Sequence, residues 1–306
     1  MIAKSFRYEF SKNRALFFMV APAILFVFVM QYIPMTGLIL AFKNYRFDKG
    51  IFGSAWNGLE NFRFLFISGD GFRITRNTFL YNLINLITSQ GLAVIIAIAI
   101  SEMPGKKFKK FCQSVTFLPY FISWVIVGTF VFNIFNFETG VMNNLLKSMG
   151  YDPVNIYSKP MVWPFIICAF NSWKWCGYNA VIYIAAITTI DPECYDAADI
   201  DGANIFQKIR YITFPSIRPT IITMLLLQVG RILRGDFEMF YQIVGNSGQL
   251  FNATDVIDTY VFRSLTTSVN IGMVAAASLY QSVLCFVIII TVNHIVKRVE
   301  ADYALF

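Results

Sequence analysis

Residues 191–215 read DPECYDAADIDGANIFQKIRYITFP, a polar and glycine-containing stretch in an otherwise apolar part of the chain. The apolar sequence VIYIAAITTI (181–190) precedes it, and SIRPTIITMLLL (216–227) follows it. A hydrocarbon core ~30 Å thick requires about 20 apolar residues per helix, and runs of this kind lie on both sides of the stretch. We therefore expect residues 191–215 to form a polar segment between two membrane-spanning helices.

The residues of this segment favour two short helices that meet at an angle. Asp191 can cap the start of a helix, and Pro192 suits its first turn. Gly202 permits a change of direction, and we expect a second helix over about residues 203–211 that ends before Pro215. These features leave two interpretations open. The bent segment can dock in a groove of another protein, or it can lie as an amphipathic loop on the lipid headgroups.

The composition indicates a membrane protein. Of the 306 residues, 57% are hydrophobic and 14% are charged, whereas soluble domains carry about 25% charged residues. The formal net charge of +7 comes from short Lys and Arg clusters between apolar runs, which argues against a nucleic-acid-binding face. Five cysteines without CxxC spacing indicate neither a zinc site nor a disulfide framework, and the single histidine excludes a histidine-based cluster. We expect no metal and no cofactor in this chain.

Six apolar runs predict an all-α membrane protein with a single domain over residues 1–306. The expected spans cover about residues 16–40, 79–101, 113–135, 162–187, 217–235 and 271–296. Basic residues cluster at the N-terminus, in EMPGKKFKKF (102–111) and at the C-terminal end. With six spans these clusters share one side of the membrane, which the positive-inside rule assigns to the cytoplasm. The same rule places both termini and residues 191–215 there.

The spacing of small and charged residues in the polar segment is specific. Asp196-Ala197-Ala198, three residues, Gly202, nine residues and Ile212-Thr213-Phe214-Pro215 follow one another over about 20 positions. This run resembles the EAA motif of permease subunits in bacterial ABC importers, whose pattern is E-A-A, three residues, G, nine residues and I-x-L-P. Asp196 stands where that pattern has Glu, on a shorter arm, and Phe214 stands where it has Leu.

The resemblance extends along nearly the whole chain. WNGLENFRFLF (56–66), LPYFISWVIVGTFVFNIFN (118–136) and the run ending in YIAA (183–186) are similar to binding-protein-dependent sugar permeases of the MalF/MalG type. DVIDTYVFRSL (255–265) and the terminal DYALF resemble the subgroup that handles oligosaccharides from complex polysaccharides.

This resemblance implies a type I ABC importer permease fold, in the plasma membrane of a bacterium, whose 191–215 segment is the coupling helix. The coupling residues that it implies are Asp196, Ala197, Ala198, Gly202, Ala203, Phe206, Ile212 and Pro215. It implies as partners a second homologous permease subunit, two cytoplasmic ATPase subunits, an extracellular solute-binding lipoprotein and an oligosaccharide substrate. The chain has no GxxxxGK[ST] phosphate loop, so ATP and Mg²⁺ are expected on the partner ATPase.

Polar residues inside the expected spans are candidates for the substrate pathway, and many recur at helical spacing on single faces. These candidates are Asn85, Asn171, Trp173, Lys174, Trp175, Tyr178, Gln228, Arg231, Arg234, Ser278 and Gln281. Asn and Ser residues also serve as hydrogen-bonding contacts between helices, and this interpretation stays open. Lys174 favours a functional role, because an ionisable residue inside a span faces a cavity or a partner by default.

The basic residues raise the hypothesis of an anionic oligosaccharide. Arg231 and Arg234 can lie at the mouth of the pathway or extend as ordinary interfacial charges.

Two other classes of function remain as alternatives at this stage. A membrane-embedded lipid or glycosyl transferase would require clustered acids or histidines, and the acids of residues 191–201 have no metal-ligand neighbours in the sequence. A stand-alone secondary transporter would show broken helices or inverted repeats, and neither is evident in the sequence. Co-purification with an ATPase distinguishes the importer from both alternatives.

Overall fold

The computed structural model describes residues 8, 12–67, 69–268 and 270–299. Lys4 and Arg7 of the basic N-terminus and the terminal DYALF lie outside the described residues. The chain divides into two compact units, which are described separately below. The first comprises Met1–Ile67 and Ser264–Leu279, and the second comprises Ser68–Arg263 and Tyr280–Phe306. The expectation of a single domain stays a prediction.

The first unit contains a long apolar helix and a small region with a two-stranded hairpin. Its helix runs through α2 Arg14–Val27, a π-helical turn Phe28–Tyr32, α3 Ile33–Met35 and a 3₁₀ segment Thr36–Phe42. The elements that follow are β1 Lys43–Asn44, α4 Gly50–Gly53, β2 Ala55–Trp56, α5 Glu60–Ile67 and a π-helical turn Ser264–Ser268. Asn61 of α5 donates to the backbone oxygens of Ala41 and Lys43, at 3.0 Å each. This amide therefore fastens α5 to the end of the helix and to the two-stranded β1–β2 pair.

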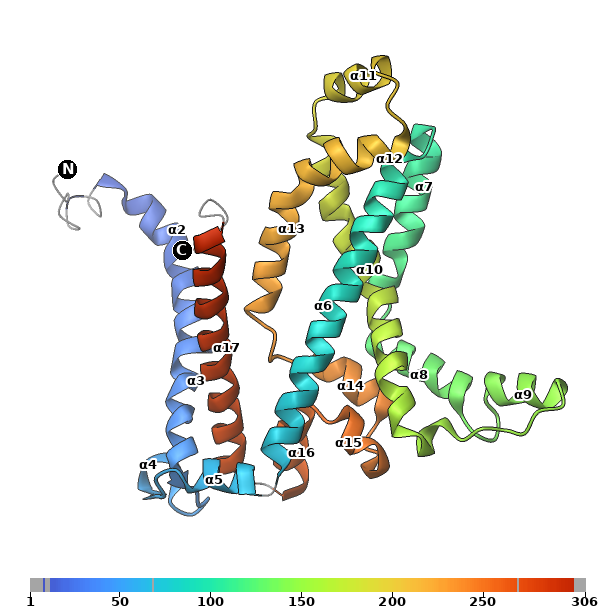
Figure 1. Cartoon of the computed structure of the whole chain (residues 1–306). Coiled ribbons are helices and arrows are strands. Elements are labelled where there is room, and N and C mark those ends of the chain that lie inside the picture. The colour runs from blue at the N-terminus through green and yellow to red at the C-terminus, as the bar shows by residue number, and fades with distance from the viewer. Residues whose placement is uncertain (1–7, 9–11, 68, 269, 300–306) are drawn as a thin grey trace. The chain divides into compact units, whose positions relative to one another are not determined.

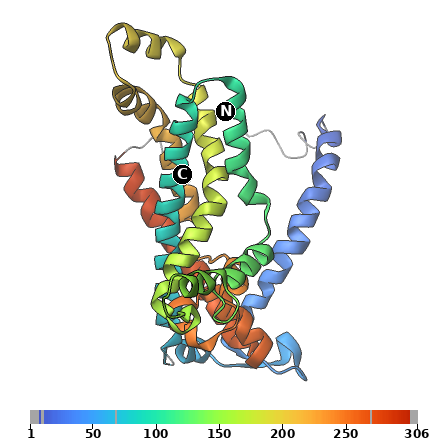
Figure 2. The same ribbon diagram turned by 90° about the vertical axis from the view of Figure 1, so that its right-hand side faces the viewer.

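The second unit is built around α6 Asp70–Glu102 and α10 Trp163–Thr188, which lie side by side (Figures 1 and 2). Its other helices are α7 Lys106–Phe117, α8 Trp124–Phe135, α9 Val141–Ser148, α11 Pro192–Ile200, α12 Ile205–Lys208, α13 Phe214–Val229, α14 Phe237–Val244, α15 Phe251–Thr254 and α16 Ile257–Arg263. Helix α17 Ile271–Val299 begins in the first unit and continues in the second from Tyr280. Short 3₁₀ segments lie at Leu118–Phe121, Ile156–Ser158, Pro160–Val162 and Gly248–Leu250, and a π-helical turn lies at Ile209–Thr213.

Small residues allow the central helices of the second unit to approach closely. Ala93 and Ala97 of α6 pack with Ala180 and Tyr183 of α10 and with Ile217 of α13 in one buried cluster. At Gly177 of α10, an added Cβ would lie 1.9 Å from a backbone oxygen of α7. Small residues let the backbones of membrane helices approach closely. The alanines and Gly177 therefore explain the close packing of α6, α10 and α7.

Four helices of the described residues are long and apolar enough to cross a membrane: Arg14–Phe42, Asp70–Glu102, Ile205–Val229 and Ile271–Arg298. A fifth candidate is the bent pair Lys106–Phe121 and Trp124–Phe135. Helix α10 covers the expected span 162–187 but does not belong to this set, because its Asn and Lys residues lower its mean hydropathy. The structure therefore supports four to five apolar helices, and six spans stay a prediction.

The helix expected over 113–135 is interrupted in the structure. The chain bends by 90° between Phe121 and Trp124. Pro119 lies in the 3₁₀ segment before the bend, and Ser123 is extended and caps α8 by accepting from the backbone N–H of Ile126. Proline cannot donate a helical bond and a serine cap begins a new helix, so these two residues break the span although every neighbour is apolar.

The expected limits of the fifth span, 217–235, are wrong. A continuous helical stretch begins at Ile205, passes through Pro215 and ends at Val229. Pro215 does not stop the second short helix, because it lies in the first turn of α13, directly after the π-helical turn Ile209–Thr213. A wider π turn is a common place for a helix to accommodate a local irregularity, and the helix continues beyond it.

Candidate functional site

The polar segment forms two helical arms around Gly202, and we call residues 191–213 the elbow. Asp191 caps α11 by accepting from the backbone N–H of Glu193 at 3.0 Å. Gly202 has a φ of +72°, a left-handed conformation that glycine adopts without strain. Asn204 and Gln207 form a reciprocal capping box at the start of the second arm. The bend at Gly202 and the cap at Asp191 confirm the local prediction made from the sequence.

Two side-chain contacts close the elbow onto itself, and we call them the latch. Asp199 of α11 forms an ion pair with Lys208 of α12. The hydroxyl groups of Tyr195 and Thr213 lie 2.9 Å apart and share a hydrogen bond. Thr213 is fully buried and belongs to the π-helical turn that leads into α13. The latch therefore joins α11 to the 205–229 helix at two places, at Lys208 in α12 and at Thr213 in the π-helical turn. The sequence predicted neither contact.

The tip of the elbow exposes large apolar side chains. Ile200 is 87% exposed and Phe206 is 78% exposed. Asp196, Ala197 and Gly202 are exposed as well. The remaining motif residues are exposed or half-buried: Ala198, Ala203, Ile212 and Pro215. Neighbouring apolar side chains that remain exposed are typical of a surface that contacts another protein or a membrane.

Polar side chains of α6 and α10 bind each other along the shared helix face. Asn179 donates to Ser89 at 3.0 Å, and Tyr183 donates to Gln90 at 2.6 Å. The candidates Asn85 and Asn171 are both buried on these helices. Gln90 and Tyr183 were not singled out in the sequence, although their spacing from Ser89 and Asn179 places them on adjoining faces. The paired contacts agree with the interpretation of polar residues as contacts between helices.

Lys174 lies at the bend between α7 and α8. Its amine donates to the backbone oxygens of Tyr120, at 3.0 Å, and Ile122. The same amine lies 5.2 Å from the ring centre of Trp124. The indole of Trp124 donates in turn to Asp236 at 2.8 Å. Lys174 is thus buried among backbone oxygens that the break in the helix leaves without a helical donor.

The aromatic candidates gather beside the same bend. Tyr178 stacks on Tyr120 with ring centres 4.4 Å apart, and Trp175 contacts both rings edge-on. Tyr178 and Trp173 remain partly exposed on α10. The structure therefore brings Lys174, Trp175 and Tyr178 to one place, with Tyr120 added. The sequence signal for Tyr120 was the neighbouring Pro119, which marks an interruption of the helix.

The turn after α13 is held by amides of two other helices. Asn82 of α6 donates to the backbone oxygens of Ile232 at 2.8 Å and Arg234 at 3.0 Å. Gln281 of α17 donates to the backbone oxygen of Leu233 at 2.7 Å. These carbonyls follow the end of a helix and have no intrahelical donor, so the two amides satisfy them.

Arg231 and Arg234 project outward from this turn, and Gln228 is half-buried in the helix before it. Asp258 of α16 accepts from the backbone N–H of Gly235 at 2.7 Å and from Gln281 at 3.1 Å. Burial raises the pKa of the Asp258 carboxyl above its ordinary value, and these two hydrogen bonds counteract part of that rise. The candidate Ser278 belongs to the first unit and is half-buried there.

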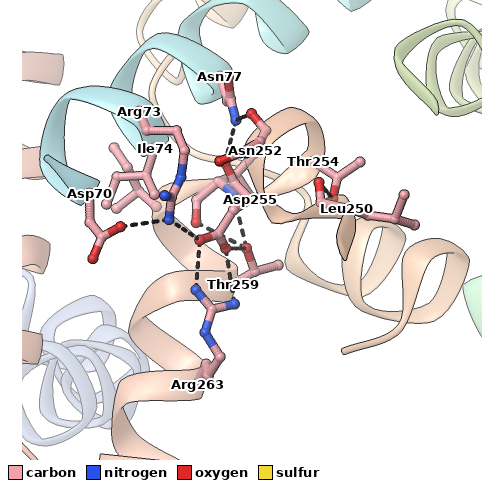
Figure 3. Close-up of polar contacts among 12 residues, drawn as sticks. Asp70, Arg73, Ile74, Asn77, Leu250, Asn252, Thr254, Asp255, Thr259 and Arg263 are labelled. Atoms are coloured by element: carbon pink, nitrogen blue, oxygen red, sulfur yellow. Dashed lines mark hydrogen bonds and ion pairs between the residues drawn. The ribbon is translucent and has the colours of Figure 1, made fainter. Parts of the chain in front are cut away.

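A buried charge cluster that the sequence analysis missed joins α6 to the 250–263 region (Figure 3). Asp255, whose side chain is fully buried, accepts from both terminal nitrogens of Arg263 at 3.1 and 2.6 Å. Arg73 reaches Asp255 at 3.5 Å and Asp70 at 2.6 Å. Thr259 donates to the same aspartate at 2.9 Å. The spacing of Asp255, Thr259 and Arg263 by four residues is the sequence signal that could have indicated it.

The part of the chain that the structure describes contains no group of three His, Cys, Asp or Glu side chains arranged to hold a metal ion. Its site features are instead an exposed elbow, buried polar contacts between helices and an aromatic cluster.

Comparison with known proteins gives consistent results. Residues 89–301 match the family described as "Binding-protein-dependent transport system inner membrane component". The chain is similar to Protein LplB of Bacillus subtilis (strain 168), with 31% identity over 95% of this chain and 91% of the relative. It is also similar to the polygalacturonan/rhamnogalacturonan transport system permease protein YteP of the same organism, with 28% identity over 94% of this chain and 89% of that protein.

A similar fold occurs in a chain from the crystal structure of a bacterial ABC transporter involved in the import of the acidic polysaccharide alginate. The TM-score is 0.87 at 31% identity, and the match covers 97% of this chain and all of the other. A second structure of the bacterial alginate ABC transporter, in complex with alginate pentasaccharide-bound periplasmic protein, matches with a TM-score of 0.86 over 97% of this chain.

Proposed function

The chain belongs to the family of binding-protein-dependent transport system inner membrane components, and from this premise we propose that its cargo is an oligosaccharide and that its elbow receives the driving force. It is a multi-pass permease subunit of an ABC importer in the bacterial plasma membrane, and not an enzyme. It works with a second permease, with separate ATPase subunits and with a solute-binding protein.

The elbow carries the proposal that this chain takes its energy from an ATPase. Ile200 and Phe206 stand almost fully exposed on a scaffold that the latch and the capping box hold rigid. Burying two such side chains stabilises a complex by about 1.5–3 kcal/mol each. A groove in the ATPase that receives this tip therefore gains affinity without ordering a flexible loop. This favours docking over an amphipathic loop on the headgroups.

The latch suggests how movement passes from the elbow into the membrane. Tyr195 binds the buried Thr213, which lies within the 205–229 helix, so a displacement of α11 moves that helix directly. The same helix packs through Ile217 against Ala93 and Tyr183. We expect closure of the ATPases to shift 205–229 against α6 and α10, and this shift opens the pathway alternately to the two sides.

The oligosaccharide cargo rests on the named relatives and on the polar and aromatic candidates. The name of YteP refers to polygalacturonan and rhamnogalacturonan, and that of the other importer to the acidic polysaccharide alginate. Tyr178, Trp175 and Tyr120 provide aromatic rings against which a sugar can pack, beside the bend that Lys174 holds. Six spans with both termini and the elbow in the cytoplasm complete the proposed arrangement, and the loops on the other side face the solute-binding lipoprotein.

Cysteine crosslinking tests the elbow. Ile200→Cys and Phe206→Cys, each in a Cys194→Ser background because Cys194 is exposed in α11, should crosslink to the ATPase in membranes. Met149→Cys, at a position that is 69% exposed and follows α9, serves as the control and should not react with the ATPase. Accessibility of residues 200 and 206 only from outside the cell would contradict the proposal.

Uptake of labelled oligosaccharides in cells that lack this chain tests the cargo. A panel of neutral and uronic-acid oligosaccharides of matched length should show at least one sugar whose uptake depends on the chain. Restored uptake of monosaccharides alone would contradict an oligosaccharide cargo and would leave the docking result unaffected.

A further inference from the structure

The start of α7 carries three lysines whose amines are free. Lys106, Lys107 and Lys110 are exposed, and their amines have no hydrogen-bond or ion-pair partner among the described residues. Lys109 differs, because it donates to the backbone oxygen of Ser101 at the end of α6. Lys109 thus holds α7 to the preceding helix. The other three lysines, Lys106, Lys107 and Lys110, make no such contact, and we call them the basic patch.

An apolar stripe continues from the basic patch along α7 and into the first residue of the 3₁₀ segment that follows it. Phe108, Phe111, Val115 and Leu118 follow one another at intervals of three, four and three residues, which places them on one helical face. Each of the four side chains is more than half exposed. At ~1.5 Å per residue the stripe extends about 15 Å along the helix, which is half the thickness of a hydrocarbon core.

The charge around the patch is not balanced within the chain. Between residues 101 and 117 there are four lysines and one acid, Glu102. No acidic side chain lies in the first turn of α7, where lysines are unfavourable because the helix dipole is positive there. Natural proteins keep a local conflict of this kind mainly at functional sites.

We propose that the basic patch and the apolar stripe together form a binding surface for anionic phospholipid. The stripe packs against acyl chains, and the three amines reach the phosphate groups at the membrane surface. A water-soluble partner such as the ATPase fits less well, because the stripe extends too far into the bilayer for such a partner to cover it. In the second unit, α7 begins at the same end as α11, so the bound lipid lies on the elbow side (Figures 1 and 2).

Retention of phosphatidylglycerol by the complete importer tests this surface. The purified complex is placed in phosphatidylcholine nanodiscs with a small fraction of phosphatidylglycerol at low ionic strength, and the lipid that remains bound is quantified by mass spectrometry. Lys106→Gln/Lys107→Gln/Lys110→Gln should weaken phosphatidylglycerol retention about a hundredfold. Each lysine near an anionic surface strengthens the binding about fivefold, and three such factors multiply. Raising the salt concentration should abolish most of the difference between wild type and variant.

A triple variant of three exposed lysines elsewhere, Lys49→Gln/Lys147→Gln/Lys159→Gln, removes the same charge and should retain the lipid as wild type does. Equal retention by the two triple variants would overturn the proposal. Loss of the ATPase from the complex with unchanged lipid retention would overturn it too, and would assign the lysines to the ATPase interface. The readout requires no transport, so a failed cargo assignment does not affect it.

Discussion

Removal of the Tyr195 hydroxyl is the most direct test of how the elbow moves the membrane helices. Tyr195→Phe leaves the ring in place but deletes the hydrogen bond to Thr213, whose hydroxyl is buried. A buried hydroxyl without a partner costs about 1–3 kcal/mol. The ion pair between Asp199 and Lys208, with an aspartate that is mostly exposed, contributes only about 0.2–1 kcal/mol. The hydroxyl pair is therefore the stronger part of the latch.

The lost free energy sets the fraction of molecules in which the elbow is released, that is, in which α11 is no longer bound to Thr213. A loss of 1–3 kcal/mol multiplies the ratio of released to latched elbow by about 5 to 150 at room temperature. A released α11 still presents its apolar tip to the ATPase but no longer moves the 205–229 helix with it. We expect ATP hydrolysis to continue and the amount of oligosaccharide imported per ATP to fall several-fold.

The assay is the complete importer reconstituted in vesicles with its solute-binding protein, with uptake and phosphate release measured in parallel. Tyr211→Phe is the matched control, because this tyrosine is exposed on the same arm and takes no part in the latch. Thr213→Val should reproduce the defect, and the double variant with Tyr195→Phe should be no worse than either single change. An unchanged ratio of uptake to hydrolysis in both single variants would refute the reasoning.

Three further changes test the packing of the second unit by thermal unfolding of the purified complex. Lys174→Met should destabilise the chain by about 1–3 kcal/mol, because two carbonyls at the α7–α8 bend lose their donor; an unchanged Tm would contradict this role. Gly177→Ala should cost about 3 kcal/mol, since its Cβ would lie 1.9 Å from a backbone oxygen of α7. Gly91→Ala, at a helical position with open space around it, should instead stabilise the chain slightly, by about 0.5–1 kcal/mol. Asp255→Ala leaves Arg73 and Arg263 without their shared acid and should lower the free energy of unfolding by about 3–5 kcal/mol. Asp48→Ala, which removes an exposed acid, is the control. A smaller loss of stability for Asp255→Ala than for Asp48→Ala would show that the cluster is unimportant.

The membrane character, the positions of most helices and the bend of the elbow follow from local sequence. Apolar runs must leave water, so the helices Arg14–Phe42 and Ile271–Arg298 agree closely with the expected spans. The cap at Asp191 and the turn at Gly202 depend on residues within a few positions, and such contacts can be anticipated from spacing alone. The motif that runs from Asp196 to Pro215 can likewise be recognised from the spacing of its residues alone.

The contacts of Lys174, the burial of Asp255 and the latch were decided only in the folded chain. Lys174 binds carbonyls more than 50 positions away, and Asn82 fastens a turn 150 positions away. Nothing in the local pattern distinguishes a lysine that fills a broken helix from one that faces a cavity. Hydrophobic pattern determines which segments enter the membrane, whereas the partner of each buried polar group depends on which helices meet, because an unpaired polar group there is too costly to leave.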